Sequence, residues 1–158
     1  MRLIVQRVAS AAVSWTDGSQ GSQHRKIGRG LVILAGAGPD DTRTKADRLA
    51  DRLAVLRIFP DEEGRTNRSV QDVGGEALVV SQFTLYADFS RGRRPSFVRA
   101  GDPALAGELV DRLADRLREQ GIGTRTGSFG AEMMVSLDND GPFTFALSTD
   151  PWETRIGG

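Results

Sequence analysis

The residues best suited to chemistry form one short segment, Ser81, Gln82, Phe83 and Thr84, which directly follows the apolar run at residues 77–80. That run is rich in β-branched residues and predicts a strand buried on both faces. Two hydroxyls and an amide then stand where a core strand would carry aliphatic side chains, and such groups cost free energy unless they are bonded or used. The segment is a candidate site, although a strand that leaves the core and bonds its hydroxyls to nearby backbone explains the same pattern.

The composition limits the mechanisms that such a site could use. The 158-residue chain contains no cysteine and a single histidine, His24. Thiol catalysis, zinc–thiolate sites and disulfide bonds are therefore excluded. Because His24 lies in a polar run that predicts an exposed loop or hairpin, a Ser-His-Asp triad is not expected. A hydrolase of this composition would rely on hydroxyls, carboxylates, backbone donors or the substrate itself.

Charge and hydropathy indicate an ordinary globular domain. With 39% apolar and 27% charged residues, the chain has the size and composition of one domain with its own core. The 21 basic and 21 acidic side chains balance, so any contact with a nucleic acid must be local. No apolar run approaches the roughly 20 residues of a membrane span, and no secretory segment opens the chain. We therefore expect a cytoplasmic protein.

The elements that position the segment can be predicted from hydrophobic periodicity. We expect one or two strands over residues 1–15, a hairpin turn at Asp17-Gly18 and a short polar return strand ending near residues 28–30. Residues 31–37 predict a buried central strand, and residues 56–59 a short one before the polar, turn-rich residues 61–75. An amphipathic helix of about 15 residues follows Asp41, and a second runs from about Asp102 to Gly121.

The last third of the chain alternates apolar and polar residues in two stretches, 131–137 and 143–147. They predict two half-buried strands facing each other across a turn at residues 138–142. The predicted fold is a single α/β domain, residues 1–149, with a mixed, largely antiparallel sheet curling toward a barrel and two main amphipathic helices. The tail at residues 150–158 carries no usable pattern.

Two clusters of charge allow more than one interpretation. Arg91, Arg93, Arg94 and Arg99 form a local basic patch suited to phosphates, or a solvated arginine loop. Asp138 and Asp140 resemble a paired acid and base, but a turn with solvated carboxylates is the better interpretation because no third partner is visible.

Three motifs, in this order and spacing, are similar to the bacterial D-aminoacyl-tRNA deacylases. They are SQFTLYAD at 81–88, GRRPSF at 92–97 and GSFGAEMMVSLDNDGPFT at 127–144. The opening MRLIVQRVASAAVSW, the segment IGRGLVILAG at 27–36 and the segment LRIFPDEEGRTNRSV at 56–70 also resemble that family. The resemblance covers roughly residues 1–149.

The resemblance implies a fold, an activity and an assembly. It implies homodimers of the deacylase fold that hydrolyse the ester joining a D-amino acid to the 3′-terminal adenosine of tRNA and spare the L-aminoacyl ester. The achiral glycyl ester is also accepted, and the activity serves proofreading in translation. No metal or organic cofactor is implied. Two other classes remain open: a non-catalytic RNA-binding module of the same fold, and a hydrolase of small D-amino-acid derivatives.

The resemblance also assigns residues. The catalytic pocket is assigned to Ser81, Gln82, Phe83 and Thr84, with the N–H of Phe83 or Thr84 as the oxyanion donor. Thr84 could instead be a nucleophile, but it has no evident base among these motifs. We therefore favour assistance by the substrate, in which the ribose 2′-hydroxyl helps to activate water or attacks the ester itself. Contacts with the RNA and its terminal adenosine are assigned to Arg93, Arg94, Phe129, Gly130, Ala131 and Met133, although core packing explains Phe129 and Met133 equally well.

The motif Gly141-Pro142 is implied to contain a cis peptide bond and to reach into the pocket of the partner subunit. There its two carbonyl oxygens would bind the substrate's amino group and leave no room for an L side chain. An ordinary turn fits the local composition equally well. Phe143 departs from the family pattern, in which a smaller aliphatic residue is commoner, so different packing is expected behind the motif.

Overall fold

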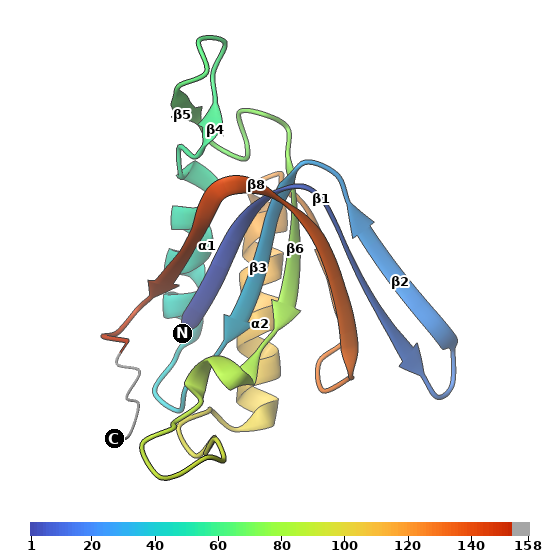
Figure 1. Ribbon diagram of the computed structural model, residues 1–158, viewed down its shortest axis with the longest axis vertical. Helices are drawn as coiled ribbons and strands as arrows, with labels where there is room; N and C mark the ends of the chain where they lie inside the picture. Colours follow the sequence, from blue (N-terminus) through green and yellow to red (C-terminus); the bar gives the residue numbers. More distant parts are fainter. Residues whose placement is uncertain (153–158) are drawn as a thin grey trace.

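Strand β1 (Arg2–Asp17) is the centre of the sheet in the computed structural model, which describes residues 1–152. On one side β1 pairs antiparallel with β3 (Gly30–Gly36) through its first half and with β2 (Gly21–Ile27) through its second half. On its other side it pairs antiparallel with β8 (Met133–Ser148) along nearly its whole length. Because β1 has different neighbours in its two halves, the sheet splays and curls there (Figure 1).

Two parallel strands extend the sheet beyond β3. β6 (Glu76–Ser81) pairs with β3, and β7 (Gly123–Thr126), which the sequence did not predict, pairs with β6. The excursion at residues 61–75 contributes β5 (Thr66–Arg68), which pairs with β4 (Phe59–Pro60) in a small separate hairpin. The prediction of one α/β domain with a mixed sheet curling toward a barrel is confirmed.

Both predicted helices are present and cover one face of the sheet. α1 (Arg43–Val55) is capped by Thr42, whose hydroxyl accepts a hydrogen bond from the Lys45 N–H at 3.3 Å. α2 (Pro103–Glu119) is capped by Asp102, whose carboxylate accepts one from the Ala104 N–H at 2.9 Å. Such caps satisfy N–H groups that the first turn leaves without partners. α1 is slightly shorter than expected, at 13 residues.

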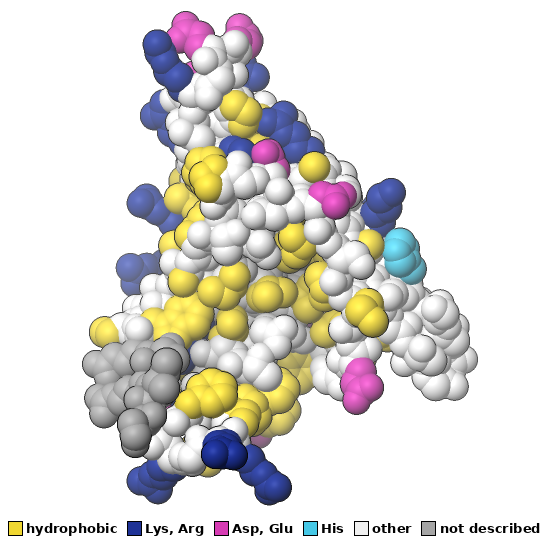
Figure 2. Space-filling view, in the orientation of Figure 1, with side chains coloured by type: hydrophobic (Ala, Val, Ile, Leu, Met, Phe, Trp, Pro, Cys, Tyr) yellow, Lys and Arg dark blue, Asp and Glu magenta, His cyan; other side chains and the backbone are white. Residues whose placement is uncertain are grey.

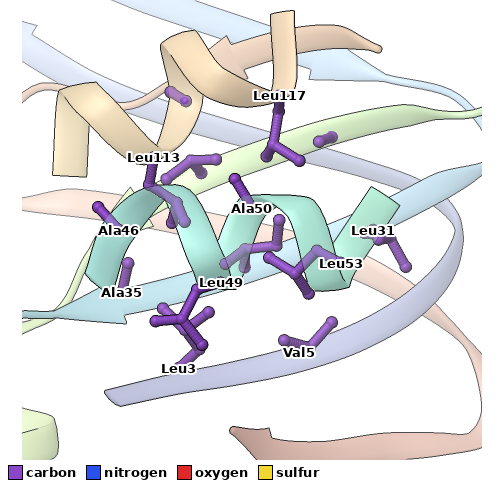
Figure 3. Close-up of a cluster of buried hydrophobic side chains, with 14 of the residues drawn as sticks. Leu3, Val5, Leu31, Ala35, Ala46, Leu49, Ala50, Leu53, Leu113 and Leu117 are labelled. Carbon is purple, nitrogen blue, oxygen red and sulfur yellow. The ribbon is translucent and has the colours of Figure 1, made fainter. Parts of the chain in front are cut away.

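The main core lies between the helices and the sheet. Figure 3 shows Leu49 and Leu53 of α1 directed at Leu3 and Val5 of β1, with Leu113 of α2 packed beside them. These leucines and Leu3 and Val5 are at most 7% exposed. Burying one such side chain typically stabilises a fold by about 1.5–3 kcal/mol, so this layer contributes strongly to stability.

The opposite face of the sheet carries a second, smaller cluster, built on Val13, Ile27, Val32, Leu78 and Val80. Its edge is only half-buried and includes Trp15 and Leu34. Figure 2 views this face, where apolar side chains gather in the hollow of the curled sheet. None of the helices in residues 1–152 is long and apolar enough to cross a membrane.

The prediction of two C-terminal strands separated by a turn is wrong. Residues 133–148 form one continuous strand, β8, and the extra residues are absorbed as an irregularity opposite Gln6–Ser10 of β1. The polar residues that suggested a turn bind β1 instead: Asp138 accepts a hydrogen bond from the Ser10 hydroxyl at 2.7 Å, and Asn139 donates one to the Arg7 carbonyl at 2.8 Å. The long partner strand therefore decides the structure here, because its groups satisfy side chains that local composition assigns to a turn.

Candidate functional site

A cavity of about 430 Å³ opens where β3 and β6 end, and it includes three of the four residues of the candidate segment. Ser81 ends β6, Gln82 follows, and Phe83 begins a short 3₁₀ helix, η1 (Phe83–Tyr86). The remaining walls are mostly apolar and come from the end of β3, the loop before α2, the first turns of α2 and a later loop: Ala35, Gly36, Ala37, Phe97, Ala100, Gly101, Pro103, Ala106, Val110, Phe129 and Gly130. Ser81 and Gln82 are thus the polar residues of a largely apolar lining.

The backbone of Gln82 is held firmly against β3. Its N–H donates to the Ala35 carbonyl at 2.7 Å. A Cβ atom at Gly36 would lie 2.7 Å from the Gln82 carbonyl oxygen, so the approach of the two chains requires glycine there. The next two N–H groups, of Phe83 and Thr84, donate to no protein acceptor within residues 1–152. Both groups therefore remain available as donors just beyond the end of β6.

The surroundings of Thr84 do not activate its hydroxyl. Its Oγ1 accepts a hydrogen bond from the side-chain amide of Gln82, which is not a base. The histidine of this chain, His24, is exposed on β2, where it pairs with Ser14 of β1 as the predicted hairpin requires. Thr84 is therefore a poor candidate for a nucleophile.

Asp41 fastens η1 to the start of α1. Its carboxylate accepts hydrogen bonds from the Tyr86 hydroxyl at 3.0 Å, from the Gly38 N–H at 2.7 Å and from the α-ammonium of Met1. Burial opposes ionisation of Asp41, but these hydrogen bonds and the charge of the ammonium outweigh it and lower the pKa of the carboxyl. Burial, with the nearby carboxylate, raises the pKa of Tyr86, which stays a neutral donor. The network fixes the far end of the candidate segment.

Replacing Asp41 by asparagine should lower the free energy of unfolding at pH 7 by about 2 kcal/mol, because hydrogen bonds to a charged acceptor are among the strongest. The native pKa lies below the unfolded value of about 3.9, so this stabilisation is present above pH 4 and disappears as the pH falls through the native pKa. Urea unfolding from pH 7 to pH 2.5 tests this, with exposed Asp40→Asn as the matched control. The prediction would be contradicted if the difference in the free energy of unfolding between Asp41→Asn and the parent stayed constant down to pH 2.5.

Aromatic rings flank the mouth of the cavity. The Phe83 ring is 54% exposed and meets Phe97 edge to face, with centroids 4.9 Å apart and planes at 71°. Phe129 is 45% exposed and rests on α2 at Gly107, where an added Cβ would lie 3.5 Å from the ring. Exposed ring faces beside a cavity suit stacking on a nucleic-acid base.

The arginine-rich segment forms a loop beside this mouth, closed by paired backbone hydrogen bonds of 2.9 Å between Asp88 and Ser96. Arg93 and Arg94 are exposed at its tip and do not line the cavity. Arg99 lies 3.8 Å from the Asp88 carboxylate. Hydrogen bonds from Ser90 lower the pKa of Asp88, and the positive charge of Arg99 lowers it further. Arg99 thus has an acidic partner, whereas the exposed Arg93 and Arg94 form no ion pair with the described residues 1–152.

Besides Arg93 and Arg94, four of the residues assigned from the sequence do not reach this cavity within one chain, and a fifth, Thr84, only borders it. Ala131 and Met133 lie outside its lining, and Met133 packs at the edge of the second apolar cluster. Thr84 lies just beyond the lining, on η1. The implied cis bond of Gly141-Pro142 is confirmed, but both residues are exposed on β8.

Gly141-Pro142 lies near the start of β6, whereas the cavity lies at the end of that strand. The position of the motif can be followed across the sheet. The irregularity of β8 that contains it lies opposite Arg7 of β1. Arg7 pairs with Leu31 of β3, and Leu31 pairs with Ala77 near the start of β6. Ser81 lies four residues further along β6, about 13 Å at 3.3 Å per residue. The motif therefore cannot enter the cavity of its own chain.

Arg7 binds the motif from behind and was not predicted. This side chain is 8% exposed, and its guanidinium donates to the Gly141 carbonyl at 3.2 Å and to the Asp140 carbonyl and carboxylate, each at 3.0 Å. Asp140 is thus an ion-pair partner rather than a solvated turn carboxylate, which corrects the sequence interpretation. The available signal was the alternation of Leu3, Val5 and Arg7, in which an arginine takes the position of an apolar residue.

No group of three or more His, Asp or Glu side chains in residues 1–152 is placed to hold a metal ion. The lining residues that sequence reasoning missed, such as Phe97, Ala106 and Val110, look like ordinary core positions in a loop and a helix. Only their place in the fold brings them to the cavity.

Comparison with known proteins agrees with this fold. The family model for D-Tyr-tRNA(Tyr) deacylase matches residues 4–148. A curated D-aminoacyl-tRNA deacylase of Roseiflexus sp. (strain RS-1) is 55% identical over 149 residues, covering 94% of each chain. Another, of Thermomicrobium roseum, is 52% identical over 157 residues, covering 99% of this chain and 98% of its own. The chain therefore belongs to the D-Tyr-tRNA(Tyr) deacylase family.

Among solved structures, the c-Myc DNA Unwinding Element Binding Protein superimposes with a TM-score of 0.82 at 34% identity, over 96% of this chain and 100% of its own. A structure described as a probable eukaryotic D-amino acid tRNA deacylase has a TM-score of 0.80 over 92% of this chain and 97% of its own. At 16% identity, that second likeness concerns the fold alone.

Proposed function

We propose that this chain hydrolyses the ester between a D-amino acid, or glycine, and the 3′-terminal adenosine of tRNA, spares L-aminoacyl-tRNA, and so proofreads chirality in the cytoplasm. The observation that carries the proposal is the cavity at the end of β3 and β6. It combines Ser81 and Gln82, two free N–H groups, exposed aromatic rings and a neighbouring arginine loop. Relatives that match nearly the whole chain are D-aminoacyl-tRNA deacylases, which supports the same activity.

In the proposed reaction, water adds to the ester carbonyl with help from the ribose 2′-hydroxyl. The bond from carbonyl carbon to water oxygen forms, the bond to the ribose 3′-oxygen breaks, and the water proton ends on that 3′-oxygen. The N–H groups of Phe83 and Thr84 bind the negative charge that develops on the carbonyl oxygen. One such donor typically contributes about 3 kcal/mol to transition-state binding.

The terminal nucleotides are proposed to bind at the aromatic mouth. Phe83 and Phe129 expose ring faces beside the cavity, and Arg93 and Arg94 lie within the adjoining loop. The part assigned to Ala131 and Met133 stays a prediction, because they do not line the cavity.

Chirality is proposed to be enforced by a second copy of the chain. Gly141-Pro142 lies too far from its own cavity but is exposed, so it is available to a partner's. The half-buried apolar hollow on the face away from the helices offers a surface for such a homodimer. In the partner's cavity, the two carbonyl groups of the motif would accept hydrogen bonds from the substrate ammonium and exclude an L side chain.

The activity is tested by measuring release of tyrosine from D-tyrosyl-tRNA and L-tyrosyl-tRNA. We expect the purified, metal-stripped protein to cleave the D ester at least about 100-fold faster. Binding of both tRNAs without cleavage would instead establish the non-catalytic RNA-binding module. Equal turnover of a small D-amino-acid ester would favour a hydrolase that needs no RNA.

Replacing Arg93 and Arg94 together by alanine should weaken tRNA binding and flatten its salt dependence. Each lost phosphate contact reduces the magnitude of the slope of log K against log salt by about 0.7–0.9. The slope of the double variant should therefore be smaller in magnitude by up to about 1.8. KM for D-tyrosyl-tRNA between 50 and 300 mM KCl measures this slope. Arg48→Ala together with Arg52→Ala, on the exposed side of α1, is the matched control. Equal slopes in the two double variants would remove the loop from the RNA-binding surface.

A further inference from the structure

The position of the Gly141 carbonyl depends on the orientation of one guanidinium group. Arg7 donates to that carbonyl through Nη2 at 3.2 Å while the same nitrogen bonds the Asp140 carboxylate at 3.0 Å. Its Nη1 donates to the Ile58 carbonyl, next to the β4–β5 hairpin. A rotation of the guanidinium plane would break these contacts together, because its donors form a rigid planar fork.

The face of that guanidinium is covered by Phe143. The carbon at the centre of the group lies 4.4 Å from the centroid of the Phe143 ring, and 5.9 Å from that of Phe59. Phe143 is half-buried against the main core, and Phe59 is fully buried. An aromatic face at this distance attracts the cation and opposes its rotation out of plane. Phe143 also follows Gly141-Pro142 in the same strand, so one segment supplies both the motif and the ring behind it.

We propose that Phe143 is a positioning residue for chiral selection: through Arg7 it fixes the direction in which the Gly141 carbonyl points. The inference rests on the proposed entry of Gly141-Pro142 into the partner's cavity. In this chain, where the Arg7 guanidinium packs on the Phe143 ring, a leucine at position 143 would fill part of the space but would offer no π face to the guanidinium. The Gly141 carbonyl would then vary in direction, and the distinction between D and L substrates would weaken.

The experiment replaces Phe143 by leucine and by mono-, di- and trifluorinated phenylalanines, which keep the shape of the ring while withdrawing charge from its face. Phe145→Leu is the matched control, because Phe145 lies on the same strand, is also half-buried and packs on the same core. The measurements are kcat/KM for D-tyrosyl-tRNA and L-tyrosyl-tRNA, and thermal unfolding.

We expect Phe143→Leu to lower kcat/KM for the D ester about 5-fold, and kcat/KM to fall stepwise along the fluorinated series. Phe143→Tyr, which keeps the ring, should restore the parent's D-to-L ratio.

Two results overturn the inference. One is a fluorinated series with constant kcat/KM and a constant D-to-L ratio, which applies even if Phe143→Leu fails to fold. The other is an equal loss in Phe145→Leu, because that would assign the effect to general packing. Gly141→Ala, assayed alongside, separates failure of the proposed role of Gly141-Pro142 from failure of the role of Phe143. Full activity in that variant removes the proposed role of the motif and this inference with it, whereas its inactivity beside an unaffected fluorinated series removes this inference alone.

Discussion

Gly141→Ala should lower kcat/KM for D-tyrosyl-tRNA by about 100-fold, the loss expected when a group at the reacting centre is displaced by about 1 Å. Within its own chain the new methyl group would meet only the Asn139 Oδ1, at 4.0 Å, and Gly141 is exposed. The free energy of unfolding should therefore change by less than about 0.5 kcal/mol. Gly18→Ala, also with open space around its Cβ position, is the matched control and should keep full activity.

Mixing subunits tests where Gly141 acts. Gly141→Ala and Gln82→Ala homodimers should both be nearly inactive, one lacking the motif and the other an intact cavity. Unfolding and refolding them together at equal concentration should restore about a quarter of the parent activity, since half of the dimers then contain one complete site out of two. If the mixture stays inactive, the motif and the cavity act within one subunit or not at all, and the cross-subunit proposal fails.

The fold was largely predictable because its core elements have regular hydrophobic periods. Leu49 and Leu53 mark the buried face of α1, and residues 31–37 the central strand, without help from tertiary contacts. Strand β7 was missed because Gly123–Thr126 has no apolar pattern and is ordered by pairing with β6. The turn at residues 138–142 was wrongly predicted for the converse reason, because Arg7 and Ser10 of a distant strand satisfy its polar groups.

The candidate site was predictable only where its residues conflict with their local environment. Ser81 and Gln82 stand out because polar side chains end a buried strand, and they do line the cavity. Ala106 and Val110 line it too but have the types and spacing of helix core residues, so no sequence pattern separates the two roles. Arg7 was missed because its partner, Gly141, is separated from it by 134 residues.

Removing the 2′-hydroxyl of the terminal adenosine should slow D-tyrosyl-tRNA hydrolysis by about 100-fold or more, the usual contribution of a general acid or base. The reason lies in what surrounds the carbonyl in the proposed complex. Thr84 accepts a hydrogen bond from an amide, the exposed His24 is on β2, and neither Asp nor Glu lines the cavity. The substrate's own hydroxyl is then the group left to assist water. A 2′-deoxy substitution at the penultimate nucleotide is the matched control and should leave the rate within about 3-fold.

Thr84→Val should retain activity within about 5-fold, because valine keeps the β-branched shape and removes only the hydroxyl. The proposed oxyanion donors, the N–H groups of Phe83 and Thr84, belong to the backbone and survive the change. Single-turnover kinetics of this variant, with normal and 2′-deoxy substrates, separate the two mechanisms. An inactive but folded Thr84→Val protein, together with normal cleavage of the 2′-deoxy ester, would make Thr84 the nucleophile and replace assistance by the substrate with an acyl-enzyme route. Slow cleavage of the 2′-deoxy ester by an otherwise active Thr84→Val protein would instead assign the chemistry to the RNA, with the protein supplying the cavity, the oxyanion donors and the choice of chirality.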